Sequence, residues 1–347
     1  MPKSSGNPLP PIPYDEVVML HDHPYPQSTP DELFNITLAE NLGSLISTTG
    51  VKVSCRSFCE ASLQELASRK SRSENFVVFN LVENVERKPE WQPRAMQALE
   101  DLGVAFTGTD AKTLLACDAD KFRMKEALIH HGLPTPIWAT RNYTKPLYEQ
   151  EGPWLVKSAL YHGSFNIHQS SISNDPTYLL TLMQEYEDAH GGLWFAEQFV
   201  NGREFYIGLI GQRGAPPELL PEAEIIYNPE VFNAGRHALL TESGKWDESG
   251  EEFKAIQARF GGLAPQDPLA ITLRTLSSQC WMALNMSGYA RVDFRTDHSG
   301  QPYILEINTN PYLGIDDSYI FQPAASMGMS VIDVLIKIIL CAHPSRP

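Results

Sequence analysis

The stretch "RVDFRTDHSGQPYILEINTNP", residues 291–311, predicts a β-hairpin that carries charge on one face. Polar and apolar residues alternate on both sides of "DHSGQ", as they do in half-buried strands joined by a turn. With the turn centred on Ser299–Gly300, Asp293 faces Glu306 across the ladder. The opposite face, which we expect to pack on a core, carries Val292, Phe294, Leu305 and Ile307.

Two facing carboxylates need an explanation, because directly opposed like charges destabilise a hairpin unless a cation compensates them. Arg291 and Asn308 share their face. Asp, Glu and Asn oxygens suit Mg²⁺, which prefers a couple of carboxylates together with substrate phosphate. The hairpin therefore predicts a metal site, and an exposed face of salt bridges is the alternative. Replacing either carboxylate by its amide is then expected to leave the fold intact.

Composition limits the class of protein. The 347 residues allow two or three domains with real cores. The net charge of −15 argues against affinity for nucleic acid or anionic membrane. The proline-rich start has no apolar signal core, and no run approaches a membrane span. Five cysteines without metal-ligand spacing indicate reduced thiols, so we expect a cytoplasmic protein.

Strands that alternate with helices predict a doubly wound parallel sheet in the first part of the chain. The expected strands are 17–20, 51–55, 76–82 and 104–108, and the expected helices are 31–49, 60–70 and 91–102. A second unit begins near Asp118, with strands 153–157 and 192–200 flanking a helix at 176–189. A third contains the hairpin, a helix near 322–342 and a long polar stretch, 228–267, of the kind that is functional or mobile.

Four segments follow one another in the order seen in D-alanine–D-alanine ligases, which belong to the ATP-grasp superfamily of carboxylate–amine ligases. They are "NLVEN" (80–84), "GTDAKTLLACDADKFRMKEALIHHGLPTP" (108–136), "EQFVNGREFYIGLIG" (197–211) and the hairpin. The chain resembles this family over residues 17–340. The resemblance implies an α/β protein of three-domain ATP-grasp architecture, in which two α+β domains clamp ATP. The N-terminal domain would span residues 1–117 and begin with a flexible tail at 1–14. The central domain would span 118–203, and the C-terminal domain, with the metal hairpin and a lid loop, would span 204–347.

The resemblance also implies roles for individual residues. Asp293, Glu306 and Asn308 would hold two Mg²⁺ ions, with Mn²⁺ as a substitute, and Arg291 would stabilise the tetrahedral intermediate. The residues implied to bind ATP are Lys121, Lys157, Gly163 and Ser164 at the phosphates, Glu197 and Val200 at the adenine, and Glu204 at the ribose. Lys245, in the lid segment "LTESGKWDES" (240–249), would close over the γ-phosphate. The alternatives are solvated surface charges and a flexible surface loop.

The chain departs from the family at the substrate end. Tyr312 follows Pro311 where the family has glycine, although its backbone N–H can still donate to an oxyanion. Asp316 and Asp317 stand where a serine is typical, and capping of the C-terminal helix is their alternative role. The N-terminal substrate glutamate is matched only by counting, by Glu32 or else Asp31. The phosphate loop "KSALYHGSFNIH" (157–168) is also altered, and we expect His162 and His168 to be loop or packing residues.

These patterns predict an ATP- and Mg²⁺-dependent ligase that forms an amide bond through an acyl phosphate. Its partners would be a small-molecule carboxylate and amine, with amino acids expected and a homodimer left open. We expect a substrate pair other than two D-alanines. The alternatives are a ligase that uses a non-amino-acid carboxylate or amine, and a nucleotide-binding protein of the same fold that has lost catalysis.

Overall fold

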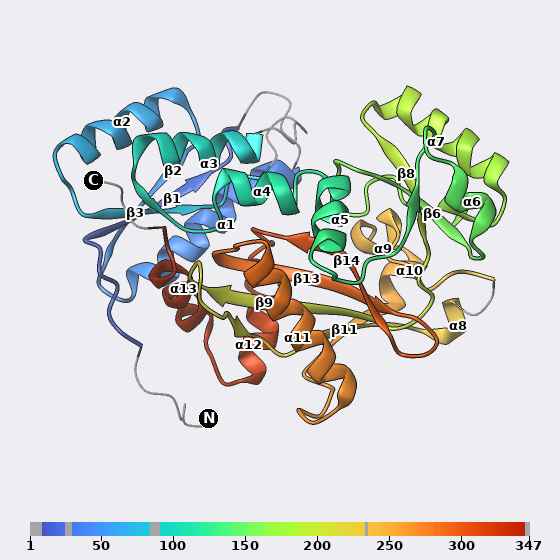
Figure 1. The fold of residues 1–347 in the computed structure, drawn as a ribbon. Helices are drawn as coiled ribbons and strands as arrows, with labels where there is room; N and C mark the ends of the chain where they lie inside the picture. Colours follow the sequence, from blue (N-terminus) through green and yellow to red (C-terminus); the bar gives the residue numbers. More distant parts are fainter. Residues whose placement is uncertain (1–8, 25–29, 84–90, 233–234, 344–347) are drawn as a thin grey trace.

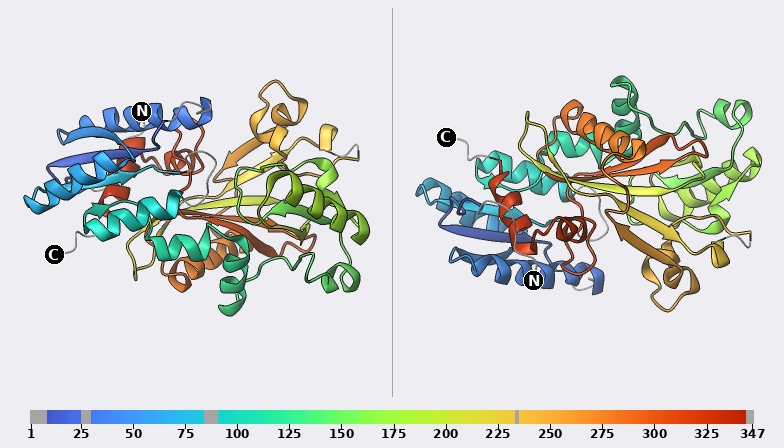
Figure 2. Two further views of the ribbon diagram at one scale, coloured as in Figure 1. Left: turned by 90° about the horizontal axis from the view of Figure 1, so that it is seen from above. Right: turned by 90° about the horizontal axis from the view of Figure 1, so that it is seen from below.

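The computed structural model describes residues 9–24, 30–83, 91–232 and 235–343. Their strands form three sheets. The N-terminal sheet and the central sheet lie at opposite ends of the molecule, and the C-terminal sheet extends between them (Figures 1 and 2). Each sheet falls within one of the expected domains, whose boundaries remain predictions. None of the helices in the described ranges is long and apolar enough to span a membrane.

The N-terminal sheet is parallel throughout, in the order β2-β1-β3-β4, as predicted. Its strands are β1 (Glu16–His21), β2 (Lys52–Ser57), β3 (Phe76–Asn80) and β4 (Ala105–Phe106). They alternate with helices α1 (Pro30–Ser47), α2 (Glu60–Ser71) and α3 (Trp91–Leu102), and α4 (Ala111–Cys117) follows β4. The β1 strand is buried along its whole length, as expected for a parallel sheet covered on both faces.

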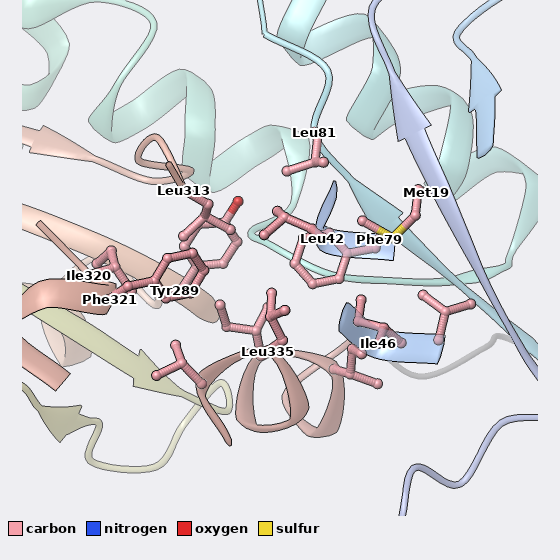
Figure 3. Close-up of a cluster of buried hydrophobic side chains, with 14 of the residues drawn as sticks. Met19, Leu42, Ile46, Phe79, Leu81, Tyr289, Leu313, Ile320, Phe321 and Leu335 are labelled. Carbon is pink, nitrogen blue, oxygen red and sulfur yellow. The ribbon is translucent and has the colours of Figure 1, made fainter. Parts of the chain in front are cut away.

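The two faces of this sheet belong to different cores. Met19 packs with Leu42 of α1 on one face, and Leu20 packs in the cluster that contains α2 and α3 on the other. Leu335, on the C-terminal helix α13 (Val331–Leu340), belongs to the same cluster as Met19 (Figure 3). The end of the chain therefore joins the N-terminal and C-terminal units in one core.

The C-terminal helix is not continuous, so the prediction of one helix near 322–342 was wrong. α12 (Phe321–Ser326) ends before Gly328, whose φ of +80° lies in the left-handed region that favours glycine. α13 then starts from a capping box, in which Ser330 and Asp333 satisfy each other's backbone N–H groups. The turn lets α13 pack against the N-terminal sheet.

The central unit contains an antiparallel sheet in the order β5-β8-β6-β7. Its strands are β5 (Trp138–Ala139), β6 (Trp154–Ser158), β7 (Ile172–Ser173) and β8 (Trp194–Gln198), and its helices are α5 (Lys121–His130), α6 (Lys145–Glu149) and α7 (Pro176–His190), with a short 3₁₀ turn, η2 (Gln169–Ser171). Asp120 caps α5, because its side chain accepts from the N–H groups of Phe122 and Arg123.

The C-terminal sheet has the order β12-β11-β9-β13-β14, with β10 added along β9. Its strands are β9 (Glu204–Gly211), β10 (Glu218–Leu219), β11 (Ala223–Tyr227), β12 (Ile256–Phe260), β13 (Gly288–Thr296) and β14 (Pro302–Asn308). Helix α11 is Pro268–Ala283. The long polar stretch contains β12 and three short helices, α8 (Pro229–Phe232), α9 (Glu242–Trp246) and α10 (Glu251–Lys254).

The predicted register of the β13–β14 hairpin is confirmed at its polar face. The facing pairs are Arg291 with Asn308 and Asp293 with Glu306. The turn lies at 297–301, where Gly300 has a φ of +87°. This register sets both carboxylates and Arg291 on the face that lines the cleft described below.

Beyond Asp293 the register shifts by one residue, because the hairpin contains a β-bulge. Phe294 therefore pairs with Ile304, and both are fully buried in the core. Leu305 turns to the opposite face and lines the cleft. The prediction that Leu305 packs in the core was therefore wrong.

Candidate active site

A single cleft collects most of the residues singled out in the sequence. It lies where the central sheet and its phosphate loop meet β9, β13 and β14 of the C-terminal sheet. The predicted residues that line it are Lys121, Lys157, Gly163, Ser164, Glu197, Val200, Glu204, Lys245, Arg291, Asp293, Glu306 and Asn308. They come from five stretches of the chain, at 121, 157–164, 197–204, 245 and 291–308, so only the fold brings them together.

Arg291 compensates the charge of Asp293. Its Nε lies 2.6 Å from Asp293 Oδ1, and its Nη2 lies 2.7 Å from Oδ2. The guanidinium is also within 4.7 Å of the ring centre of Tyr206, and the Asn308 amide donates to Asp293 Oδ2 at 3.1 Å. A bidentate pair of this kind is the strong form of a charge-assisted hydrogen bond.

Glu306 is compensated by different cations. Lys121 Nζ lies 3.2 Å from Glu306 Oε1, and His162 Nδ1 lies 2.8 Å from the same oxygen. Burial alone would favour the neutral carboxyl, but Lys121, His162 and Lys157 outweigh it and hold the pKa of Glu306 well below its usual range. The two facing carboxylates therefore differ, because burial, followed by the charges of Glu306 and Glu204, outweighs Arg291 and raises the pKa of Asp293 above its usual value.

His162 is a site residue that the sequence analysis missed. Besides Glu306, it contacts Asp118, whose Oδ1 lies 3.5 Å from His162 Nε2. Asp118 is held in turn by Thr309, which donates its backbone N–H and its hydroxyl to Oδ2 at 2.8 and 2.9 Å. A histidine in an altered glycine-rich loop gave no signal of this role, because its partners lie in other segments.

The donor set fits a magnesium site. Asp293, Glu306 and Asn308 present two carboxylates and one amide to the cleft from adjacent strands. Among the described residues, no three His, Cys, Asp or Glu side chains gather as a metal-binding group. Two carboxylates with few other protein ligands suit Mg²⁺, which completes its shell from phosphate oxygens and water. The fit rests on this oxygen chemistry and not on the charge of the hairpin, which the protein's own cations offset.

Glu197 lies between two lysines. Its Oε1 is 2.7 Å from Lys157 Nζ, and its Oε2 is 2.5 Å from Lys125 Nζ. Burial raises the pKa of Glu197, but the two ammonium groups outweigh it and leave that pKa below its usual value. Lys125 was missed in the sequence, where its position four residues after Lys121 was the only signal.

Glu204 is fixed by hydroxyl groups of two neighbouring strands. Tyr206 and Tyr227 donate to its two oxygens at 2.6 and 2.7 Å. Arg295 stands opposite Glu204 in the β9–β13 ladder, with Nε 3.7 Å from Oε2. An oriented carboxylate at the edge of the cleft can accept hydrogen bonds from a pair of hydroxyls.

The phosphate loop turns sharply, with Gly163, Ser164 and Asn166 at φ values of +70°, +60° and +53°. The lid segment is hydrogen-bonded to this loop. Trp246 Nε1 donates to the Gly163 carbonyl at 2.9 Å, and Glu242 N donates to the Ile167 carbonyl at 2.8 Å. Successive N–H groups in such a turn make a concave site for anions.

The lid also brings Lys245 into the cleft. Burial, and then repulsion from Arg291, lower the pKa of Lys245. Trp246 beside it stays largely exposed. The lid is therefore docked over the phosphate loop in this structure, with its cation directed inward.

Tyr312, Asp316 and Asp317 are not among the residues that line this cleft. The Tyr312 hydroxyl is hydrogen-bonded to Asp317, and both side chains lie over Gly314, where a Cβ would come within 2.4 Å of Tyr312 Oη. The first residues of α12 are instead satisfied by Ser318, whose hydroxyl accepts from Phe321 N. The helix-capping alternative for the two aspartates was therefore wrong. The side chains of Asp31 and Glu32 lie outside the described part of the chain.

One carboxylate from the N-terminal unit, that of Glu83, lies near Tyr312. Burial first, and then Asp317, Glu83 and Asp316, raise the pKa of Tyr312. Glu83 follows β3, and its backbone N–H donates to Asp22 at 3.0 Å. Burial and the Asp22 charge raise the pKa of Glu83 to about 7. Glu83 and Asp22 were not predicted as site residues.

The comparisons with known proteins agree with this geometry. The family model "D-ala D-ala ligase C-terminus" matches residues 148–340. An uncharacterized protein of Sinorhizobium fredii is 28% identical over 270 residues, which cover 77% of this chain and 74% of that protein. The D-alanine–D-alanine ligase of Bordetella avium is 27% identical over 249 residues, covering 70% and 71% of the two chains.

Solved structures share the fold. The D-alanine–D-alanine ligase of Bacillus anthracis complexed with ATP superposes with a TM-score of 0.70 at 19% identity, covering 94% of this chain and 96% of that one. D-alanyl-alanine synthetase A of Vibrio cholerae gives a TM-score of 0.71 at 13% identity, covering 94% and 97%. With more than half of the sequence matched by the family model, the chain belongs to the D-alanine–D-alanine ligase family and is an ADP-forming ATP-grasp ligase that joins a carboxylate to an amine.

Proposed function

We propose that the enzyme phosphorylates a carboxylate with ATP, passes the acyl group to an amine, and uses a substrate pair other than two D-alanines. One observation carries the first part. The phosphate-binding cations and the metal-type oxygens line the same cleft, on facing sheets. Phosphoryl transfer needs positioning and charge stabilisation more than covalent chemistry, and this cleft supplies both.

ATP would lie between the central and C-terminal sheets. Glu197 and the backbone of Val200 would receive the adenine, and Glu204, oriented by its two tyrosines, would bind the ribose hydroxyls. The residues proposed for the phosphates are Lys121, Lys157, the loop at Gly163 and Ser164, and Lys245 of the lid. Lysine suits this task because it is a compact point charge with three donors.

Asp293, Glu306 and Asn308 would hold the Mg²⁺ ions, two by the family pattern, with Mn²⁺ as a substitute. Bound there, the ions would neutralise charge on the phosphates that are transferred and released. Arg291 pairs with Asp293 and Lys121 pairs with Glu306, and each cation favours the ionised form of its partner, which is the form that binds a metal ion.

The reaction would proceed in two displacements. A substrate carboxylate oxygen attacks the γ-phosphorus, the bond to the β-phosphate oxygen breaks, and ADP leaves. The amine nitrogen, after losing a proton, then attacks the acyl carbon, and the C–O bond to phosphate breaks. Arg291 and the N–H of Tyr312 would stabilise the oxyanion between these events. Trp246, bonded to Gly163, helps to exclude the water that would hydrolyse the acyl phosphate.

The second part of the proposal rests on the charge near Tyr312. A pocket for two methyl side chains has no use for a tyrosine beside an aspartate, or for the half-buried Glu83 near it. Several carboxylates within reach of one another favour a substrate with a cationic group, which forms charge-assisted hydrogen bonds. Asp317 and Tyr312 would meet that group.

The test compares phosphate and ADP release with D-alanine alone against pairs of other amino acids, cationic ones included. We expect weak release with D-alanine and stronger release with a pair in which one member carries a second amino group. Efficient formation of D-alanyl-D-alanine, with no better pair among those tested, would refute the substrate part. Binding of Mg-ATP with no phosphate release in any mixture would indicate a substrate that is not an amino acid.

A further inference from the structure

Lys125 is a charged side chain buried in the interior of the protein, with no exposed surface. It lies four residues after Lys121 and therefore on the same face of α5, yet it is not among the residues that line the cleft. Its Nζ contacts Glu197 Oε2 at 2.5 Å, Thr135 Oγ1 at 2.9 Å and the Pro136 carbonyl at 3.0 Å. The contacts with Thr135 and Pro136 are hydrogen bonds, and the contact with Glu197 is an ion pair. Burial lowers the pKa of Lys125 to about 8 against the charge of Glu197, so the ammonium form is still favoured at pH 7.

Glu197 connects this buried lysine to the cleft. Its side chain is almost completely buried, and its second oxygen holds Lys157, which does line the cleft. A buried carboxylate is unfavourable unless it is paired, and here each oxygen has its own lysine. We call Lys125, Glu197 and Lys157 the ion triplet. Lys125 is its inner end, and Lys157 is its outer end.

The same lysine is tied to the metal-binding hairpin. Thr135, which accepts from Lys125, donates to the Ile304 carbonyl at 2.9 Å. Ile304 N donates back to the Pro134 carbonyl at 2.8 Å. These bonds hold the segment after α5 against β14 at the bulge, two residues before Glu306. Lys125 thus connects the two sheets that enclose the cleft.

We propose that Lys125 is a positioning residue for the nucleotide, which keeps Glu197 ionised and fixed so that Glu197 aims Lys157 at the phosphates and offers the base an acceptor-only carboxylate. This inference rests on the proposed function, because it takes ATP to occupy the cleft. Lys125 itself does not touch the nucleotide, since Glu197 lies between them.

The role has a consequence for base selection. An ionised carboxylate only accepts hydrogen bonds, and it therefore favours the exocyclic amino group of adenine over the carbonyl of guanine. Without Lys125, Glu197 keeps only Lys157 as a cationic partner, so its protonated form becomes more favourable. A protonated carboxyl can donate a hydrogen bond to the carbonyl of guanine. Loss of Lys125 should therefore weaken ATP binding and narrow the preference for ATP over GTP.

A double-mutant cycle separates this role from a general effect on the fold. Dissociation constants for Mg-ATP and Mg-GTP would be measured by calorimetry for the wild type, Lys125→Met, Glu197→Gln and the double variant. We expect Lys125→Met to weaken ATP binding about 30-fold, as loss of one partner of a buried charge pair does, and to shrink the ATP-to-GTP ratio. In the Glu197→Gln background the same substitution should have no further effect on either nucleotide.

Two controls complete the cycle. Lys145→Met removes an exposed lysine of the same unit and should change nothing. Thr135→Val removes one acceptor of Lys125 without changing the charge of Glu197. The ratio of the dissociation constants for ATP and GTP should therefore stay as in the wild type. If the Lys125→Met protein fails to fold, the Glu197→Gln protein and the double variant still test the proposal. The proposal requires that these two proteins bind ATP with equal affinity.

The remaining outcomes would overturn either the positioning role of Lys125 or the proposed function. Equal weakening by Lys125→Met in both backgrounds, or an unchanged ATP-to-GTP ratio, overturns the positioning role and leaves Lys125 as a structural residue. A wild type that binds neither nucleotide overturns the proposed function itself, and the inference with it. The wild-type titration therefore distinguishes the two failures.

Discussion

Replacing Asp293 with asparagine should destabilise the protein, although the sequence alone suggests the opposite. From the hairpin pattern, the change removes one of two facing negative charges, and stability is expected to hold or rise. In the structure, Asp293 is the bidentate partner of Arg291, and their side chains are 8% and 15% exposed. Asp293→Asn therefore leaves a buried guanidinium without its counter-ion.

The magnitude follows from three contributions. Breaking one side of a buried ion pair is unfavourable by about 3–5 kcal/mol. Removal of the repulsion between Asp293 and Glu306 offsets about 0.2–1 kcal/mol of this loss. The hydrogen bond that Arg291 still donates to the asparagine oxygen offsets about 1 kcal/mol more. We expect a net loss of about 2–3 kcal/mol in the free energy of unfolding, measured by urea denaturation in the presence of a chelator.

Glu306→Gln is the matched control. Glu306 is 24% exposed, and Lys121 keeps a second acceptor, the Tyr161 carbonyl at 2.8 Å. We expect a loss of about 1 kcal/mol or less, while both variants should abolish Mg²⁺-dependent phosphate release. An Asp293→Asn protein that unfolds at the wild-type urea concentration would refute the reasoning about Arg291. Wild-type turnover in either variant would refute the metal assignment.

Three further results are expected. His162→Ala should raise the Mg²⁺ concentration needed for half-maximal activity about 10–100-fold, because it removes the hydrogen bond that orients Glu306. His168→Ala in the same loop should leave that concentration unchanged, and equal effects of the two substitutions would contradict the role of His162. Arg291→Ala should slow amide formation at least about 100-fold with ATP affinity within several-fold of wild type, and failure to bind ATP would show that Arg291 is misassigned. Glu83 has a folded pKa of about 7 against 4.5 unfolded, so it lowers stability as pH rises from 4.5 to 7. Glu83→Gln should therefore raise the free energy of unfolding by on the order of 2 kcal/mol at pH 8 and leave it unchanged near pH 4, and a gain at both pH values would contradict the assignment.

The hairpin register could be predicted because two local rules determine it. Side chains alternate across a strand, and a turn of known residues sets which positions face each other. The bulge could not be predicted, because it depends on a contact from another segment. Pro134 and Thr135 take both backbone groups of Ile304, so the ladder gains a residue there and Leu305 turns to the cleft.

The partners of the charged residues needed the fold for the same reason. Helical spacing puts Lys125 on the face of Lys121, but nothing in the sequence indicates that Glu197, 72 positions later, receives it. A lone lysine in a helix is normally a solvated charge. Strand period identified the hairpin carboxylates Asp293 and Glu306. The other carboxylates and the lysines predicted for the cleft were identified only through the family resemblance.

The carboxylates around Tyr312 were the least predictable part of the molecule. Glu83 and Asp22 follow the ends of two parallel strands, and Asp317 lies in a turn before α12. None of these positions belongs to a periodic element, so only the family resemblance singled out Asp317, and no pattern singled out Glu83 or Asp22. The fold brings Glu83 and Asp317 toward Tyr312, and burial raises the pKa of Glu83 to about 7. Under the proposed function, a cationic group on the substrate would offset the negative charge of these carboxylates.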